Sequence, residues 1–125
     1  MGFWRFAPML CLLAACASEV PRTSVLLMAV NAENSAETHR TGASIDIDAG
    51  TGYVRVLPQG TIVKRVGSIG QGIVYKPTNF TLSIEGKHIH EAYLVVQSGN
   101  LVGFYLPVEK AFVASNKTKE IILLN

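Results

Sequence analysis

Two histidines, His88 and His90, come closest in this chain to a chemical site. Residues two apart on a strand point to one face, so both imidazoles could bind one metal ion, with Glu85 or Glu91 as a third ligand. Zinc needs at least three well-placed protein ligands, and Glu91 is expected on the opposite face. We therefore predict no metal site and interpret the pair as the start of a strand near solvent. A metal-dependent protein that uses both histidines is the alternative.

Other patterns that could carry chemistry are also incomplete. Asp46 and Asp48 share one face of a predicted strand and could form an acid pair or contact calcium, but solvated strand positions are the simpler interpretation. The segment 67–72, GSIGQG, fits neither the dinucleotide-binding nor the P-loop spacing and predicts a glycine-rich turn or bulge. The sequence contains no G-x-S-x-G nucleophile elbow. We predict that the protein is not an enzyme and has no catalytic residue, cofactor or metal ion.

Cys16 ends the first hydrophobic run of the chain, and the residues before it predict a processing signal. Arg5 comes first and an apolar stretch over residues 9–15 follows, which is the order of a secretory signal peptide. A membrane-spanning helix needs about 20 apolar residues. Pro8 lies before this stretch and Ser18 soon after it, so the apolar run is too short to span a membrane.

The four residues Leu13-Ala14-Ala15-Cys16 resemble the lipobox of bacterial lipoproteins, which directly follows the apolar run. The resemblance implies that Cys16 receives a diacylglyceryl thioether, becomes the first residue after cleavage and is then N-acylated, with palmitate as a typical chain. Two or three acyl chains anchor a protein stably in a membrane, whereas one does not. An ordinary signal peptide cut after Ala15 or Ala17, or a retained N-terminal helix, is the alternative.

This processing divides the chain into three parts. Residues 1–15 are the signal peptide that is removed, residues 16–23 form a lipidated tether, and residues 24–125 form a single β-rich domain. No Asp directly follows the cysteine, which resembles outer-membrane sorting in lipoproteins of enteric bacteria. The resemblance therefore implies a lipid-anchored protein of the bacterial cell envelope, in the outer membrane and facing the periplasm.

Charge and cysteine content limit the partners of the domain. Of the eleven Lys and Arg residues only Arg5 precedes Cys16, and none of the nine Asp and Glu residues does. This near balance, without a basic cluster, argues against nucleic-acid binding. Cys11 lies in the signal peptide and Cys16 would be lipidated, so the domain is predicted to contain no thiol or disulfide. Its stability must then come from packing.

Apolar residues alternate with polar ones from Ala43 onward, which is typical of β-strands. Ile45 and Ile47 alternate with Asp46 and Asp48 and are expected to form the buried face of a half-buried strand. A β-branched run over residues 24–30 precedes them, and residues 31–42 are expected to form a surface loop. No long helix is predicted. The pattern indicates an all-β fold, a small antiparallel barrel or sandwich of about seven to nine short strands.

The longest coherent unit is a hairpin over residues 88–107, with Gly99-Asn100 as its predicted two-residue turn. This turn places Val95 opposite Phe104 and leaves both faces of the hairpin apolar. A solvated ribbon cannot be apolar on both faces. We therefore expect the hairpin to be central to the fold, or to present one face to a partner.

Two segments resemble bacterial SH3-like barrels. Residues 57–63, LPQGTIV, look like the entry to an early barrel strand, and residues 103–113 are similar to the closing segment, where a 3₁₀ turn precedes the last strand. The resemblance implies an SH3-like domain, and another small sandwich or barrel is the alternative.

Together these features predict a non-catalytic envelope lipoprotein that acts as an assembly or scaffold subunit of an envelope complex, such as a secretion or conjugation machine. Its expected partners are the membrane, through the lipid anchor, and an envelope protein. The alternative is an SH3-like module that binds peptidoglycan or a peptide. Exposed aromatic residues would line its groove, and the candidates are Tyr53, Tyr75, Tyr93 and Tyr105.

Overall fold

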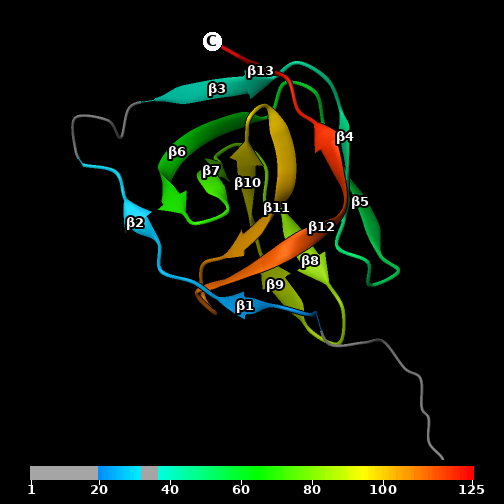
Figure 1. The fold of residues 1–125 in the computed structure, drawn as a ribbon. Helices are drawn as coiled ribbons and strands as arrows, with labels where there is room; N and C mark the ends of the chain where they lie inside the picture. Colours follow the sequence, from blue (N-terminus) through cyan, green and yellow to red (C-terminus); the bar gives the residue numbers. More distant parts are fainter. Residues whose placement is uncertain (1–19, 32–36) are drawn as a thin grey trace, which may run out of the picture.

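The computed structural model describes residues 20–31 and 37–125 and shows an all-β protein of antiparallel strands (Figure 1). The predicted fold class is confirmed. The described residues form thirteen strands, more than the predicted seven to nine, because several strands are only two or three residues long. In chain order the strands are β1 (Thr23–Ser24), β2 (Met28–Ala29), β3 (Thr38–Thr41), β4 (Ile45–Asp48), β5 (Val54–Leu57), β6 (Ile62–Ile69), β7 (Gly72–Pro77), β8 (Ser83–Glu85), β9 (Ile89–Glu91), β10 (Tyr93–Gln97), β11 (Asn100–Leu106), β12 (Ala111–Glu120) and β13 (Leu123–Leu124).

Nine of these strands form one large sheet in the order β1-β12-β11-β10-β7-β6-β3-β13, in which β2 also pairs with β6. The remaining strands form two hairpins, β4–β5 and β8–β9. We call the face of the large sheet that packs against these hairpins the inner face, and the opposite one the outer face. The arrangement is an open, sandwich-like stack in which antiparallel strands bury one face against a second layer.

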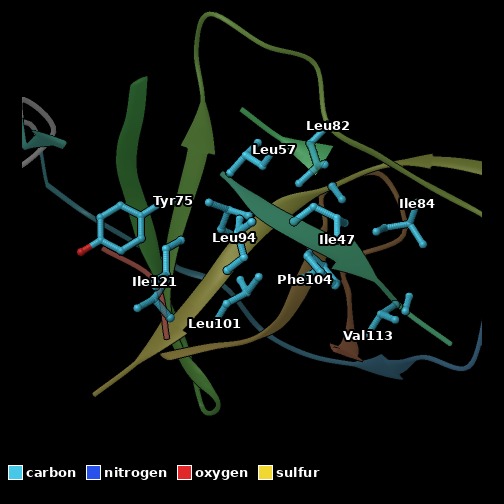
Figure 2. Close-up of a cluster of buried hydrophobic side chains, with 14 of the residues drawn as sticks. Ile47, Leu57, Tyr75, Leu82, Ile84, Leu94, Leu101, Phe104, Val113 and Ile121 are labelled. Atoms are coloured by element: carbon cyan, nitrogen blue, oxygen red, sulfur yellow. The ribbon is translucent and has the colours of Figure 1, made fainter. Parts of the chain in front are cut away.

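The main hydrophobic core fills the space between the inner face and the two hairpins (Figure 2). The large sheet contributes Leu94 and Phe104, both fully buried, and the hairpins contribute Ile47, Leu57 and Ile84. Ile45 and Ile47 point inward and Asp46 points outward, as their alternation predicts. Burying one side chain of this size stabilises the folded state by about 1.5–3 kcal/mol. The packing of these side chains therefore holds the two layers together.

The β10–β11 hairpin is central, as predicted, but its predicted register is wrong. The turn lies at Ser98 and Gly99, whose φ angles are 53° and 79°, the pair of positive values that a type I′ turn requires. Next to this turn Val96 lies opposite Leu101, and farther along Leu94 lies opposite Phe104 and Val95 opposite Gly103. A single register shift between Val95 and Val96 leaves Val102 of β11 as an extra residue and moves the pairing back by one position toward the predicted register.

The outer face of this hairpin is covered by the chain's own N-terminal segment, residues 23–30, which we call the strap. The strap begins as β1 beside β12 and ends as β2 beside β6 (Figure 1). Between these ends Val25 and Leu27 pack on a second cluster that includes Val95 and Tyr105. The predicted need for a cover on the second apolar face is thus met within the chain.

The strap lies very close to β6. A Cβ atom added at Gly67 would lie 2.5 Å from the backbone oxygen of Met28 and 2.9 Å from Cδ1 of Leu27. Gly67 belongs to the GSIGQG segment, which was predicted to be a turn or bulge, and the register between β6 and β7 shifts between Arg65 and Gly67. The first three residues of the segment extend β6, and Gly70-Gln71 form the turn to β7.

Two predictions, the start of the domain and the surface loop over residues 31–42, are wrong. Val20 is 1 % exposed and belongs to the main core, and Thr23–Ser24 is β1, so the folded domain begins before residue 24. Thr38–Thr41, expected in a surface loop, is β3 and pairs with β6 and β13. Both segments are too polar and too short to show a strand period in the sequence.

Candidate functional site

A groove of about 730 Å³ lies beside β6, β7 and β10, next to the strap on the outer face. Lys64 and Lys76 stand directly opposite each other on β6 and β7. Tyr93 on β10 adds an aromatic wall, and its ring lies 5.8 Å from Nζ of Lys76. The lining is completed by Val66, Pro77, Thr78, Asn79, Phe80, Thr81, Leu82, Glu91 and Ala92.

The rim of the groove is fixed by hydrogen bonds across the sheet. The Asn79 side chain accepts a hydrogen bond from the backbone N–H of Ile62 at 2.8 Å and donates one to the oxygen of Gly60. The backbone N–H of Thr78 donates to the oxygen of Ile62, also at 2.8 Å. These bonds hold the loop after β7 in one position, so the groove is largely preformed, as binding sites commonly are.

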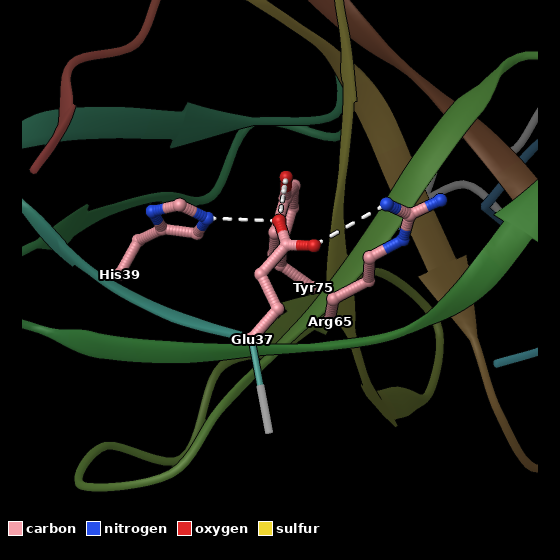
Figure 3. Close-up of polar contacts among 4 residues, drawn as sticks. All are labelled: Glu37, His39, Arg65 and Tyr75. Carbon is pink, nitrogen blue, oxygen red and sulfur yellow. Dashed lines mark hydrogen bonds and ion pairs between the residues drawn. The ribbon is translucent and has the colours of Figure 1, made fainter. Parts of the chain in front are cut away.

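A second polar cluster joins the start of β3 to β6 and β7 (Figure 3). Nε2 of His39 lies 2.9 Å from Oε2 of Glu37, and Nη1 of Arg65 donates to Oε1 at 3.3 Å. The hydroxyl of Tyr75 also points to Oε2, at 3.4 Å. Three side chains from separate strands thus converge on one carboxylate.

The charges in this cluster shift two pKa values. The hydrogen bond from His39 lowers the pKa of Glu37 and outweighs the opposing effect of burial, and Arg65 lowers it further. Burial, followed by the charge of Glu37, raises the pKa of Tyr75. Glu37 is thus held as a carboxylate and Tyr75 as a neutral donor. The contacts of Glu37 therefore attach the start of β3 to β6 and β7.

The rings of His88 and His90 lie edge to face with their centroids 6.4 Å apart, but the two residues do not start a strand near solvent as predicted. His88 precedes β9 and is exposed, whereas His90 is buried and its Nδ1 lies 2.8 Å from Oε2 of Glu109. Glu85 pairs with Arg55 instead. Across residues 20–31 and 37–125, no group of three or more His, Cys, Asp or Glu side chains is placed to hold a metal ion.

The two aspartates of β4 take separate partners on β12. Asp46 lies 3.8 Å from Nζ of Lys119, and Asp48 accepts hydrogen bonds from Asn116 and from the backbone of Gly50. Each carboxylate helps to fasten the β4–β5 hairpin to the large sheet. Neither is arranged as an acid pair with the other.

Of the four candidate tyrosines, only Tyr93 and Tyr105 lie side by side. Tyr75 and Tyr105 are only 5 % and 4 % exposed, so the prediction that they line an exposed groove is wrong. Tyr75 faces the inner core, while Tyr105 packs on the outer cluster with its ring 6.3 Å from that of Tyr93. Tyr53 is exposed but lies beside β5, on the separate β4–β5 hairpin. Only Tyr93 lines the groove.

Both lysines of the groove, as well as Glu37 and Glu109, were not among the residues predicted from the sequence. Lys64 and Lys76 are twelve positions apart in number, and only the pairing of β6 with β7 makes them neighbours. The predicted lipidation site, Cys16, lies outside the described residues.

No protein-family model matches the chain, and neither a curated protein nor a solved structure is significantly similar to it. Of the two segments that resemble SH3-like barrels, the first runs from the end of β5 through a turn into β6, and the second covers the paired strands β11 and β12. An SH3-like domain therefore stays a prediction. In the part of the chain that the structure describes, no helix has the length and hydropathy needed to cross a membrane.

Proposed function

We propose that this chain is a non-catalytic bacterial envelope lipoprotein, anchored through Cys16 in the outer membrane and facing the periplasm. It serves as an assembly or scaffold subunit of an envelope complex, such as a secretion or conjugation machine. A protein partner is supported by the solvent-exposed face of the β4–β5 hairpin. This face carries two exposed valines on an edge strand.

Val54 and Val56 are 56 % and 52 % exposed, and they alternate with Arg55, which pairs with Glu85 of β8. Among the described strands β5 pairs only with β4, so its other edge is open to a further strand. A β-branched edge of this kind is suited to pairing with a strand of another protein. Asp46 and Asp48 lie opposite the two valines but already have Lys119 and Asn116 as partners, so the matching partner surface is apolar.

The buried position of Val20 supports a short connection to the membrane. If Cys16 carries the lipid, four residue steps separate it from the core, and they span at most about 14 Å. The domain would then rest close to the lipid headgroups. A subunit held this way can meet only partners at the same membrane surface.

A photo-crosslinking amino acid placed at Val56 tests the proposed protein contact in intact cells of the native host. We expect one reproducible adduct from Val56 and none from the same amino acid at Gln97, an exposed position at the β10–β11 turn. A Val54→Lys change made together with the probe should abolish the adduct. Recovery of only the uncrosslinked chain from Val56, with normal expression, would count against the assembly role.

The groove beside β6, β7 and β10 favours a second candidate function, a module that binds peptidoglycan or a peptide. It is preformed and combines charged, amide and aromatic groups, as recognition sites do. Co-sedimentation with purified cell wall tests this function. We expect the domain to pellet with the wall, and a domain that stays in the supernatant would exclude the wall-binding version.

A further inference from the structure

We propose that the groove binds the carboxylate of a peptide chain, with the carboxylate between Lys64 and Lys76 and an adjoining apolar group against Tyr93. This inference rests on the second candidate function, peptide or wall binding, and names the chemistry of its ligand. It does not depend on the lipid anchor or on the assembly role.

The first support is an unbalanced pair of charges. Lys64 and Lys76 are directly cross-strand neighbours, and like charges in such positions destabilise a sheet. Within residues 20–31 and 37–125, neither lysine has a carboxylate within ion-pair distance. In contrast Arg55, Arg65 and Lys119 are each paired with an acidic side chain. A bound anion would relieve the repulsion between the two lysines.

The second support is the position of the ammonium group of Lys76. Its Nζ lies 5.8 Å from the centre of the Tyr93 ring, within the range of a cation–π contact. Lys76 is exposed, and this contact places its ammonium group beside the aromatic wall of the groove. An anion bound there meets a positioned cation and a flat apolar wall.

The net charge of the lining distinguishes a monoanion from a dianion. The charged residues that line the groove are Lys64, Lys76 and Glu91, which together carry one net positive charge. A carboxylate matches this charge, whereas a phosphate dianion would exceed it and be repelled by Glu91. The amide of Asn79 is already bonded to the backbone, so charge rather than side-chain amide recognition should dominate.

The test is an NMR titration of the isotopically labelled protein with a short N-acetylated peptide bearing a free C-terminal carboxylate. The same peptide as its C-terminal amide, and inorganic phosphate, are the comparison ligands. We expect saturable shifts of the backbone amides of Lys64, Lys76 and Tyr93 with the free acid, and at least tenfold weaker binding of the amide. No saturable shift at these residues with the free acid at 50 mM or below, equal binding of both peptides, or tighter binding of phosphate would overturn the proposal.

Charge substitutions give effects of opposite sign, which a structural role would not produce. Lys64→Gln and Lys76→Gln should each weaken binding of the free acid about 3–10-fold, and Glu91→Gln should strengthen it about 2–5-fold. The control Lys87→Gln changes an exposed lysine that does not line the groove and should have no effect. Unchanged affinity in both groove-lysine variants, with native spectra, would contradict the proposed site.

The wall-binding function and the carboxylate site in the groove can be contradicted independently of each other. If the domain pellets with cell wall but does not bind the free acid, the wall-binding function stands and the carboxylate site is wrong. If the free acid binds in the groove but the domain does not pellet, the site stands and its ligand is a peptide other than the cell wall.

Discussion

Nδ1 of His90, on β9, lies 2.8 Å from Oε2 of Glu109, in the turn between β11 and β12. The pair ties the β8–β9 hairpin to the edge of the large sheet where the strap begins. Burial raises the pKa of Glu109, but the hydrogen bond from His90, a backbone hydrogen bond and the charges of His90 and Arg22 together lower it below its ordinary value. The folded state therefore favours the ionised form of Glu109.

This relationship predicts a loss of stability in acid. A carboxylate whose pKa is lowered by folding contributes stability above its unfolded pKa, near 4.5, and loses it as the pH falls through the lower, folded value. Glu109→Gln should reduce the free energy of unfolding by about 1–2 kcal/mol at pH 7 and by clearly less at pH 3. Urea unfolding at the two pH values measures this, with Glu120→Gln, on an exposed residue, as the control. An equal loss at both pH values would contradict the interpretation.

The cluster around Glu37 predicts a coupled titration. The charge of Glu37 helps to raise the pKa of Tyr75, so Glu37→Gln should lower the pKa of Tyr75 toward 10 while burial still holds it above that value. NMR of ring-labelled tyrosine over alkaline pH measures the Tyr75 titration in the wild type and in the variant. Glu37 is partly exposed, so the same change should cost less than about 1 kcal/mol of stability. An unchanged Tyr75 titration would show that the carboxylate does not act on this hydroxyl.

Sequence periodicity was informative where strands were half-buried. Ile45 and Ile47 alternate with aspartates and are buried as expected, because β4 has one face on the core and one in solvent. The register of the β10–β11 hairpin could not be obtained in this way. Ser98-Gly99 and Gly99-Asn100 are both plausible turns, and the choice between them depends on the bulge and on the strands at either side.

The candidate sites depend on contacts between distant parts of the chain. His90 was noticed because of His88, yet its partner is Glu109, nineteen positions later. Tyr75 and Tyr93 are both aromatic residues on strands, but one faces the inner core and the other the groove. Composition carries no information about such placements, which follow from the strand order of the large sheet.

The close packing of the strap on β6 predicts that two glycine substitutions change stability by unequal amounts. An added Cβ at Gly67 would meet the strap backbone at 2.5 Å, whereas one at Gly70 would meet nothing within 4 Å. Gly67→Ala should therefore destabilise the protein by about 1–3 kcal/mol and speed amide hydrogen exchange in residues 25–29, and Gly70→Ala should change little. Chemical denaturation and hydrogen exchange test both variants. Equal effects of the two substitutions would contradict the close packing of the strap.

The buried position of Val20 predicts where the folded domain begins. Val20→Ala should lower the free energy of unfolding by about 1–3 kcal/mol, because it removes buried methyl groups from the main core. Leu26→Ala changes a strap residue that is 82 % exposed and should stay within about 0.5 kcal/mol of the wild type. Thermal and urea unfolding of both variants measure the difference. A neutral Val20→Ala would instead support a tether that extends through residue 23.

The attachment of lipid to Cys16 is the central claim of the proposed function. Metabolic labelling with an alkyne-bearing palmitate analogue, followed by mass spectrometry of the N-terminal peptide, tests it directly in bacteria that express the full chain and its Cys16→Ser variant. We predict that the wild type carries label on a mature chain that begins at Cys16, and that the variant carries none. An unlabelled wild type, or label that persists in Cys16→Ser, would contradict the claim.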